Sequence, residues 1–111
     1  MNHHFDVEGI VRYSMLQHGD FNDKAFHLAV HVITNDYYND PKNFSETHHH
    51  DFDEINVVIP SSEHFKYEIE LDGDVQVLSA PFSIFIPSGC PHRALPLEGL
   101  GVFICIQFRP Q

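Results

Sequence analysis

The sequence predicts an all-β protein with a single domain, built as a small antiparallel sandwich or barrel. Its 111 residues are enough for one domain but not for two. Short segments in which apolar and polar residues alternate recur along the chain, separated by Pro and Gly turns, which is typical of antiparallel strands. No long amphipathic stretch shows the spacing of a helix.

The first part of the chain is predicted to lie outside the barrel. Residues 1–22 contain apolar side chains without clean periodicity, interrupted by Gly9 and Gly19. We expect them to form an N-terminal arm, either an edge strand or a contact with a partner subunit. The barrel domain is predicted to span residues 23–111. Its first strand is expected at 25–34, where β-branched residues are frequent.

The remaining strands follow a turn-rich segment at 35–45. Alternating apolar residues predict them at 55–59, 63–71, 75–78, 82–86 and 100–108. Between two of these strands, Asp72-Gly73-Asp74 predicts a tight hairpin, because Gly73 can adopt the positive φ that such a turn requires. Six or more short strands favour a sandwich or a barrel.

The composition argues against several classes of partner. The formal net charge is −10 and the six Lys and Arg residues are scattered, whereas a nucleic-acid surface needs clustered basic residues. The chain has neither the ~18 consecutive apolar residues of a membrane span nor a recognisable signal peptide. Cys90 and Cys105 do not make a disulfide framework. We therefore expect a cytoplasmic protein whose partner is a small molecule.

The segment 48–54, His-His-His-Asp-Phe-Asp-Glu, concentrates imidazole and carboxylate groups directly before an apolar strand. Because side chains alternate along an extended chain, His48, His50 and Glu54 are predicted to share one face. Two nitrogen donors and one oxygen donor on one face suit a divalent transition metal. A fourth ligand is expected from His92, which follows a Pro and Gly turn after another strand.

Two motifs in the chain resemble those of the cupin superfamily. They are His48-x-His50-x-x-x-Glu54 and Pro87-x-Gly89-x-x-His92, and with the strands between them the resemblance covers residues 45–108. The resemblance implies a jelly-roll β-barrel, also called a double-stranded β-helix, in which the three histidines and Glu54 bind one metal ion. The chain departs from the family pattern at three positions, which touch turns rather than ligands: Ser61 and Pro81 replace glycines, and Pro96 replaces an asparagine.

The donor set also bears on the chemistry. A mixed set of imidazoles and one carboxylate suits Zn or Fe(II), with Ni, Mn or Co as alternatives, and leaves one or two coordination positions open. The leading hypothesis is a metal-dependent enzyme acting on a small molecule, either an oxidoreductase using Fe(II) and dioxygen or a Lewis-acid zinc enzyme. The chain is also similar to the zinc-binding cupin modules of hydrazine synthetases, which join two nitrogen atoms. The alternative is a small-ligand-sensing cupin domain without catalysis.

Several further residues are candidates for the site. Tyr67, Arg93 and His31 are candidate catalytic residues, and Arg93 is the cation expected at the mouth of the site because it follows His92. Cys90, in the loop before His92, is either incidental or a thiol that takes part. Aromatic side chains are expected to form the apolar wall of a small-ligand pocket: Phe52, Phe65, Tyr67, Phe85 and Phe103.

A barrel of this size is also predicted to pair with a second copy. An open barrel has exposed strand edges, and natural proteins cover such edges by pairing or by other means. With an apolar N-terminal arm available as well, the sequence predicts a homodimer.

Overall fold

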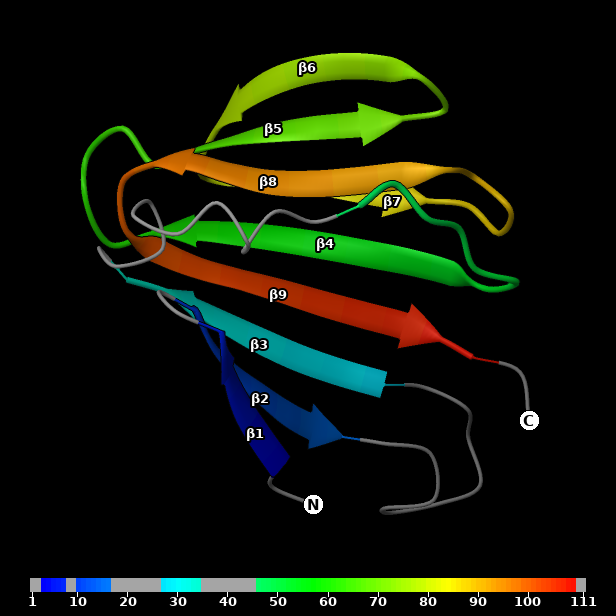
Figure 1. The fold of residues 1–111 in the computed structure, drawn as a ribbon, viewed down its shortest axis with the longest axis horizontal. Coiled ribbons are helices and arrows are strands. Elements are labelled where there is room, and N and C mark those ends of the chain that lie inside the picture. The colour runs from blue at the N-terminus through cyan, green and yellow to red at the C-terminus, as the bar shows by residue number, and fades with distance from the viewer. Residues whose placement is uncertain (1–2, 8–9, 17–26, 35–45, 110–111) are drawn as a thin grey trace.

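The computed structural model describes residues 3–7, 10–16, 27–34 and 46–109, which form two antiparallel sheets (Figure 1). The strands of the larger sheet are β1 (His3–Val7), β2 (Ile10–Leu16), β3 (His27–Ile33), β4 (Asp53–Pro60), β7 (Phe82–Ile86) and β9 (Gly101–Phe108). The strands of the smaller sheet are β5 (Lys66–Leu71), β6 (Asp74–Ser79) and β8 (His92–Glu98). Their orders are β1-β2-β3-β9-β4-β7 and β6-β5-β8. The prediction of an all-β, jelly-roll architecture is confirmed.

Side chains that alternate inward along both sheets form one hydrophobic core. Val58 on β4, Phe65 before β5 and Tyr67 on β5 are 0–2% exposed. The Tyr67 ring stacks on Phe103 of β9, with centroids 5.2 Å apart, so the small sheet packs directly on the large one. Burying one large apolar side chain contributes about 1.5–3 kcal/mol, so these contacts hold the two layers together.

Gly101 at the start of β9 allows Phe65 to enter this core. A Cβ atom at Gly101 would lie 2.5 Å from the Phe65 ring and 2.4 Å from the carbonyl oxygen of Ile59. No real Cβ contact is that short, so the ring can pack here only against a glycine backbone.

The predicted strands are found with small shifts of their ends. The hairpin between β5 and β6 has φ of 51° at Asp72 and 84° at Gly73, as a tight two-residue turn requires. Strand β8 was not predicted, because Pro96 lies in the middle of it. The structure places β8 at the edge of its sheet, and the pairing register with β5 shifts between Lys66 and Tyr67, the latter opposite Pro96. Proline is tolerated at edges and bulges of this kind.

The N-terminal strands β1 and β2 extend the larger sheet by antiparallel pairing, with β2 joined to β3 and β1 at the edge. The predicted boundary between arm and barrel, after residue 22, and the predicted turn segment at 35–45 lie outside the described residues. The described residues contain no helix that is long and apolar enough to cross a membrane.

Candidate metal centre

The candidate site lies at the end of the barrel where β4 and β8 begin and β9 ends (Figure 1). The segment before β4 crosses to the small sheet there, and the backbones of His48 and His92 pair as an isolated antiparallel bridge. The neighbouring loop between β7 and β8 is held to the same segment, because the Gly89 amide donates to the carbonyl of His50 at 2.7 Å. The Ser88 amide donates to the Asp53 carboxylate at 2.9 Å. The backbone therefore fixes both ligand-bearing segments.

Three imidazoles converge at this point. One ring nitrogen from each of His48, His50 and His92 lies within 4.8 Å of the other two, a separation at which all three can reach one metal ion. The ring centroids are 4.3 Å apart for His48 and His92 and 4.9 Å apart for His48 and His50. Exposure falls across the triad, from His48 at the surface through half-buried His50 to His92, which is 4% exposed.

Backbone carbonyls orient two of these rings. Nδ1 of His48 lies 2.8 Å from the carbonyl oxygen of Glu46, and Nδ1 of His92 lies 2.9 Å from that of Cys90. A carbonyl only accepts, so each Nδ1 carries the proton and each Nε2 keeps a lone pair. Nε2 of His92 is buried and has no hydrogen-bond partner among the residues that the structure describes. A buried nitrogen lone pair without a donor is costly unless something binds it, and a cation would do so.

Burial lowers the pKa of His50 below its usual range. Glu54 acts in the opposite direction, while His48, His92 and Arg109 add to the lowering. The net effect favours the neutral imidazole near neutral pH, which is the form that binds metal ions.

Glu54 lies beside the triad and faces two of its rings. Its Oε1 is 3.6 Å from Nε2 of His50, and its Oε2 is 3.9 Å from Nε2 of His92. Two buried amides hold the carboxylate, with Gln107 donating to Oε1 at 3.0 Å and Asn56 donating to Oε2 at 2.8 Å. Glu54 is 4% exposed and has no Lys or Arg partner among the described side chains. A divalent ion would balance this buried charge, so the donor set fits a metal.

Gln107 belongs to this site although the sequence did not single it out. Strand register places it directly opposite Glu54 on one side and His27 on the other. It is a buried polar residue on the face of β9 that also carries Phe103 and Cys105. The sequence offered one sign of this role: Gln107 is a polar residue on the otherwise inward-facing side of the strand, and a buried amide needs a hydrogen-bond partner.

Arg93 does not reach the site, which corrects the sequence prediction. Its Nη2 lies 2.6 Å from Oε2 of Glu68 and its Nε lies 3.6 Å from Oε1 of Glu70. These carboxylates lie on the outer face of β5, whereas His92 points inward. Neighbouring residues of a strand face opposite sides of the sheet, so adjacency to His92 directs Arg93 away from it.

The other predicted site residues lie in different parts of the structure. Phe52 lies at the site, with its ring stacked on His50 at a centroid distance of 4.6 Å. Phe85 is on the outer face of β7 and 56% exposed, so it does not line the inside of the barrel. The remaining predicted residues lie deeper in the barrel, where they pack with the core: Phe65, Tyr67, Phe103 and His31, which stacks on Phe103. Cys90 contributes its carbonyl, as described above.

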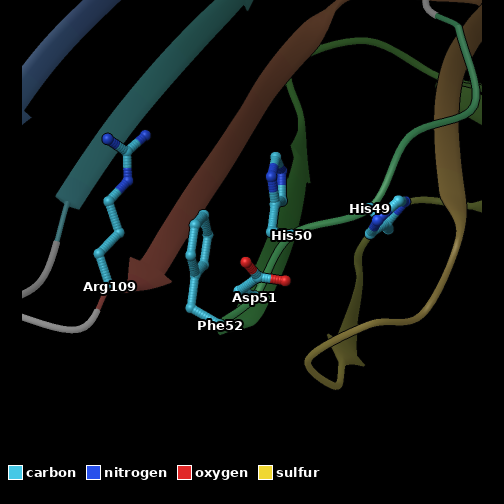
Figure 2. Close-up of a pocket in the computed structure, with 5 residues that line it drawn as sticks. All are labelled: His49, His50, Asp51, Phe52 and Arg109. Atoms are coloured by element: carbon cyan, nitrogen blue, oxygen red, sulfur yellow. The ribbon is translucent and has the colours of Figure 1, made fainter.

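An open pocket of about 490 Å³ adjoins the triad (Figure 2). It is lined by His49, His50, Asp51, Phe52 and Arg109. Figure 2 shows the Phe52 ring between the guanidinium of Arg109, at the end of β9, and the imidazole of His50. The guanidinium carbon lies 5.5 Å from the centroid of the Phe52 ring. Arg109 therefore takes the place at the mouth of the site that was expected for Arg93.

Comparison of the sequence with protein-family models and with curated proteins finds no match. The structure, however, is similar to solved cupins. An RmlC-like cupin from Shewanella frigidimarina matches with a TM-score of 0.69 and 19% identity, over 100% of this chain and 86% of that one. KdgF from Halomonas sp. matches with a TM-score of 0.66 and 21% identity, over 98% of this chain and 88% of that one. Fe(II) HppE matches with a TM-score of 0.65 and 14% identity, over 95% of this chain and 56% of that one.

These likenesses establish the fold. The chain has the cupin fold, and three histidines that could hold a metal ion lie at one end of its barrel.

Proposed function

We propose that this chain is an enzyme that uses one divalent transition metal, held by His48, His50, His92 and Glu54, to act on a small molecule. The observation that carries the proposal is the convergence of the three imidazoles, where Nε2 of His92 is buried and has no hydrogen-bond partner in the described part of the chain. When bound, such an ion would supply a Lewis acid with a coordination position left for water or substrate.

The surrounding residues support this role by holding the donors in place. Both oxygens of Glu54 accept hydrogen bonds from buried amides, so the carboxylate keeps one orientation. The imidazoles of His48 and His92 are fixed by backbone carbonyls, which present Nε2 to the centre. Partners of this kind set the tautomer and the orientation of metal ligands.

The pocket beside the triad supports a small-molecule partner. Its volume of about 490 Å³ lies within the ~300–1,000 Å³ usual for small-molecule sites. Because His50 belongs both to the triad and to the pocket wall, a molecule in the pocket lies against the proposed ion.

Two kinds of chemistry are open to such a centre. Iron would support oxidative chemistry with dioxygen, and one similar structure is an Fe(II) protein by its name. Zinc would support Lewis-acid chemistry, in keeping with the likeness of the motifs to the hydrazine-synthetase modules. A ligand-sensing domain could use the same pocket without turnover.

Cobalt substitution tests whether the centre is open. Metal-free protein is loaded with Co(II) and titrated with azide, while the visible absorption bands are recorded. We expect azide to shift the bands of the wild-type protein and of a His49→Gln variant, because an open position accepts an exogenous ligand. Unchanged bands would contradict an open, catalytic centre. Oxygen uptake by Fe(II)-loaded protein, absent in a His92→Gln variant, would favour the oxidative reaction over sensing.

A further inference from the structure

We infer that the small molecule carries a carboxylate group, and that Arg109 binds this carboxylate beside the metal centre. The juxtaposition that carries the inference is an arginine that has no carboxylate partner among the described residues and lies over the aromatic ring that stacks on a proposed metal-binding histidine. The inference names the substrate class of the proposed site and so rests on the proposed function.

Arg109 differs from the other cations whose side chains are described. Lys66 lies 3.4 Å from the carboxylate of Glu98, and Arg93 pairs with Glu68. The contacts of Arg109 within the described part of the chain are instead the amide oxygen of Gln107 and the ring of Phe52. In a chain with a formal net charge of −10, an arginine without a carboxylate partner is unusual. It has charge and donors to offer a ligand.

The position of Arg109 connects it to the triad through one stack. Its guanidinium lies over the Phe52 ring, and that ring is nearly parallel to His50, with an interplanar angle of 8°. Figure 2 shows the three groups side by side along one wall of the pocket. A ligand that spans this wall would touch the cation at one end and reach the metal centre at the other.

The guanidinium is also fixed in orientation. Nε and Nη2 of Arg109 both donate to Oε1 of Gln107, with Nε at 2.8 Å. Nε2 of the same Gln107 amide donates to the Glu54 carboxylate. One buried side chain therefore contacts both Arg109 and the proposed metal centre. Two of the five N–H donors of the guanidinium are used in this way, and the others are available for a carboxylate.

The charge of the pocket favours one carboxylate over a multiply charged anion. The Asp51 side chain lines the same pocket, and the rest of the chain is strongly acidic. These negative charges would repel a polyphosphate more strongly than a monoanion. A single carboxylate also matches the planar N–H donors of the Arg109 guanidinium.

Benzoate and its neutral analogue benzamide provide a matched pair of probes. Zinc-loaded protein is titrated with each by calorimetry. We expect benzoate to bind at least roughly tenfold more tightly than benzamide, since the charge-assisted hydrogen bonds require the anion. The preference for benzoate is expected to persist in Arg93→Gln. That substitution also removes one positive charge, but from the outer face of β8, away from the pocket. It is expected to disappear in Arg109→Gln and to be reduced in Arg109→Lys.

Zinc affinity is measured for the same variants, because Arg109 also holds Gln107. If Arg109→Gln keeps zinc affinity within a few-fold and loses the benzoate preference, the inference is supported. Equal binding of the two probes to wild-type protein, or an unchanged preference in Arg109→Gln, would overturn it while leaving the metal centre intact. If the protein takes up no zinc but the metal-free form still prefers benzoate through Arg109, the anion site stands and the proposed function fails.

Discussion

The backbones of His48 and His92 are joined by two hydrogen bonds, one from each amide to the other's carbonyl, at 3.0 Å and 2.8 Å. This pair connects the segment before β4 to the start of β8. Two of the proposed ligands are therefore brought into register by main-chain contacts that need no metal ion. We therefore expect the fold to organise the proposed centre before an ion binds.

Metal removal is accordingly expected to leave the fold intact. Chelator-treated protein should keep the far-ultraviolet circular dichroism of a β protein, because the contacts that form the strands and the bridge are main-chain hydrogen bonds. Restoring the ion should raise the melting temperature, since binding to the native state alone stabilises by about 2.7 kcal/mol at a free ion concentration of 100 times Kd. Circular dichroism during chelation and reloading checks this. A β spectrum that collapses on chelation would show that the ion builds the fold.

Replacing Glu54 by Gln is expected to weaken metal binding without unfolding the protein. The substitution keeps the size of the side chain but removes the negative charge that faces His50 and His92. We expect a loss of at least ~10–100-fold in zinc affinity, measured by competition with a chromophoric chelator. Glu63→Gln is the matched control, because the Glu63 side chain is 95% exposed. Wild-type affinity in Glu54→Gln would mean that three histidines suffice.

The outer face of the larger sheet bears on the predicted homodimer. The alternating side chains on the outside of β3, β4, β7 and β9 are apolar apart from Asp53 and Ser83, and register aligns them in rows across the sheet: Leu28, Val30, Val32, Ile55, Val57, Ile59, Phe85, Val102, Ile104, Ile106 and Phe108. An apolar face of this kind on an acidic protein is typical of an interaction surface. Asp53 lies at the end of this face, opposite Phe108, and the other rows carry no carboxylate. We therefore expect the homodimer to form through those rows.

A charge placed in this face should dissociate the dimer. Light scattering coupled to size-exclusion chromatography is expected to give twice the subunit mass for wild-type protein and one subunit mass for Ile104→Glu. Val77→Glu on β6 serves as the control, because Val77 is 57% exposed and lies on the other sheet. A wild-type protein that runs as one subunit would refute the homodimer, and an Ile104→Glu dimer would place the interface elsewhere.

The sequence predicted the fold class well because the signals for it are local. The alternation in β5 and the turn at Gly73 depend on neighbours in the chain, and both are found. Strand β8 was missed because Pro96 is compatible with a strand only at an edge or a bulge, and neither can be seen in the chain itself.

The site was predicted less completely than the fold. The histidines could be named because two motifs carry them, but the choice between Arg93 and Arg109 depends on which face of a strand each occupies. Arg109 lies two positions after inward-facing Gln107, so the period of two would have favoured it. The interior aromatic residues could not be divided between core and pocket, because strand register decides which layer each one occupies.

The metal content of the protein tests the central claim most directly. Wild-type, His48→Ala and His49→Ala proteins are purified without added metal, incubated with zinc or Fe(II), desalted and analysed by plasma mass spectrometry. His48 and His49 are both exposed neighbours, so neither substitution should disturb the core. We expect about one ion per chain in wild type and His49→Ala, and a loss of most of it in His48→Ala. A wild-type protein without bound ion, or His48→Ala protein that keeps it fully, would contradict a metal centre built on the three converging histidines.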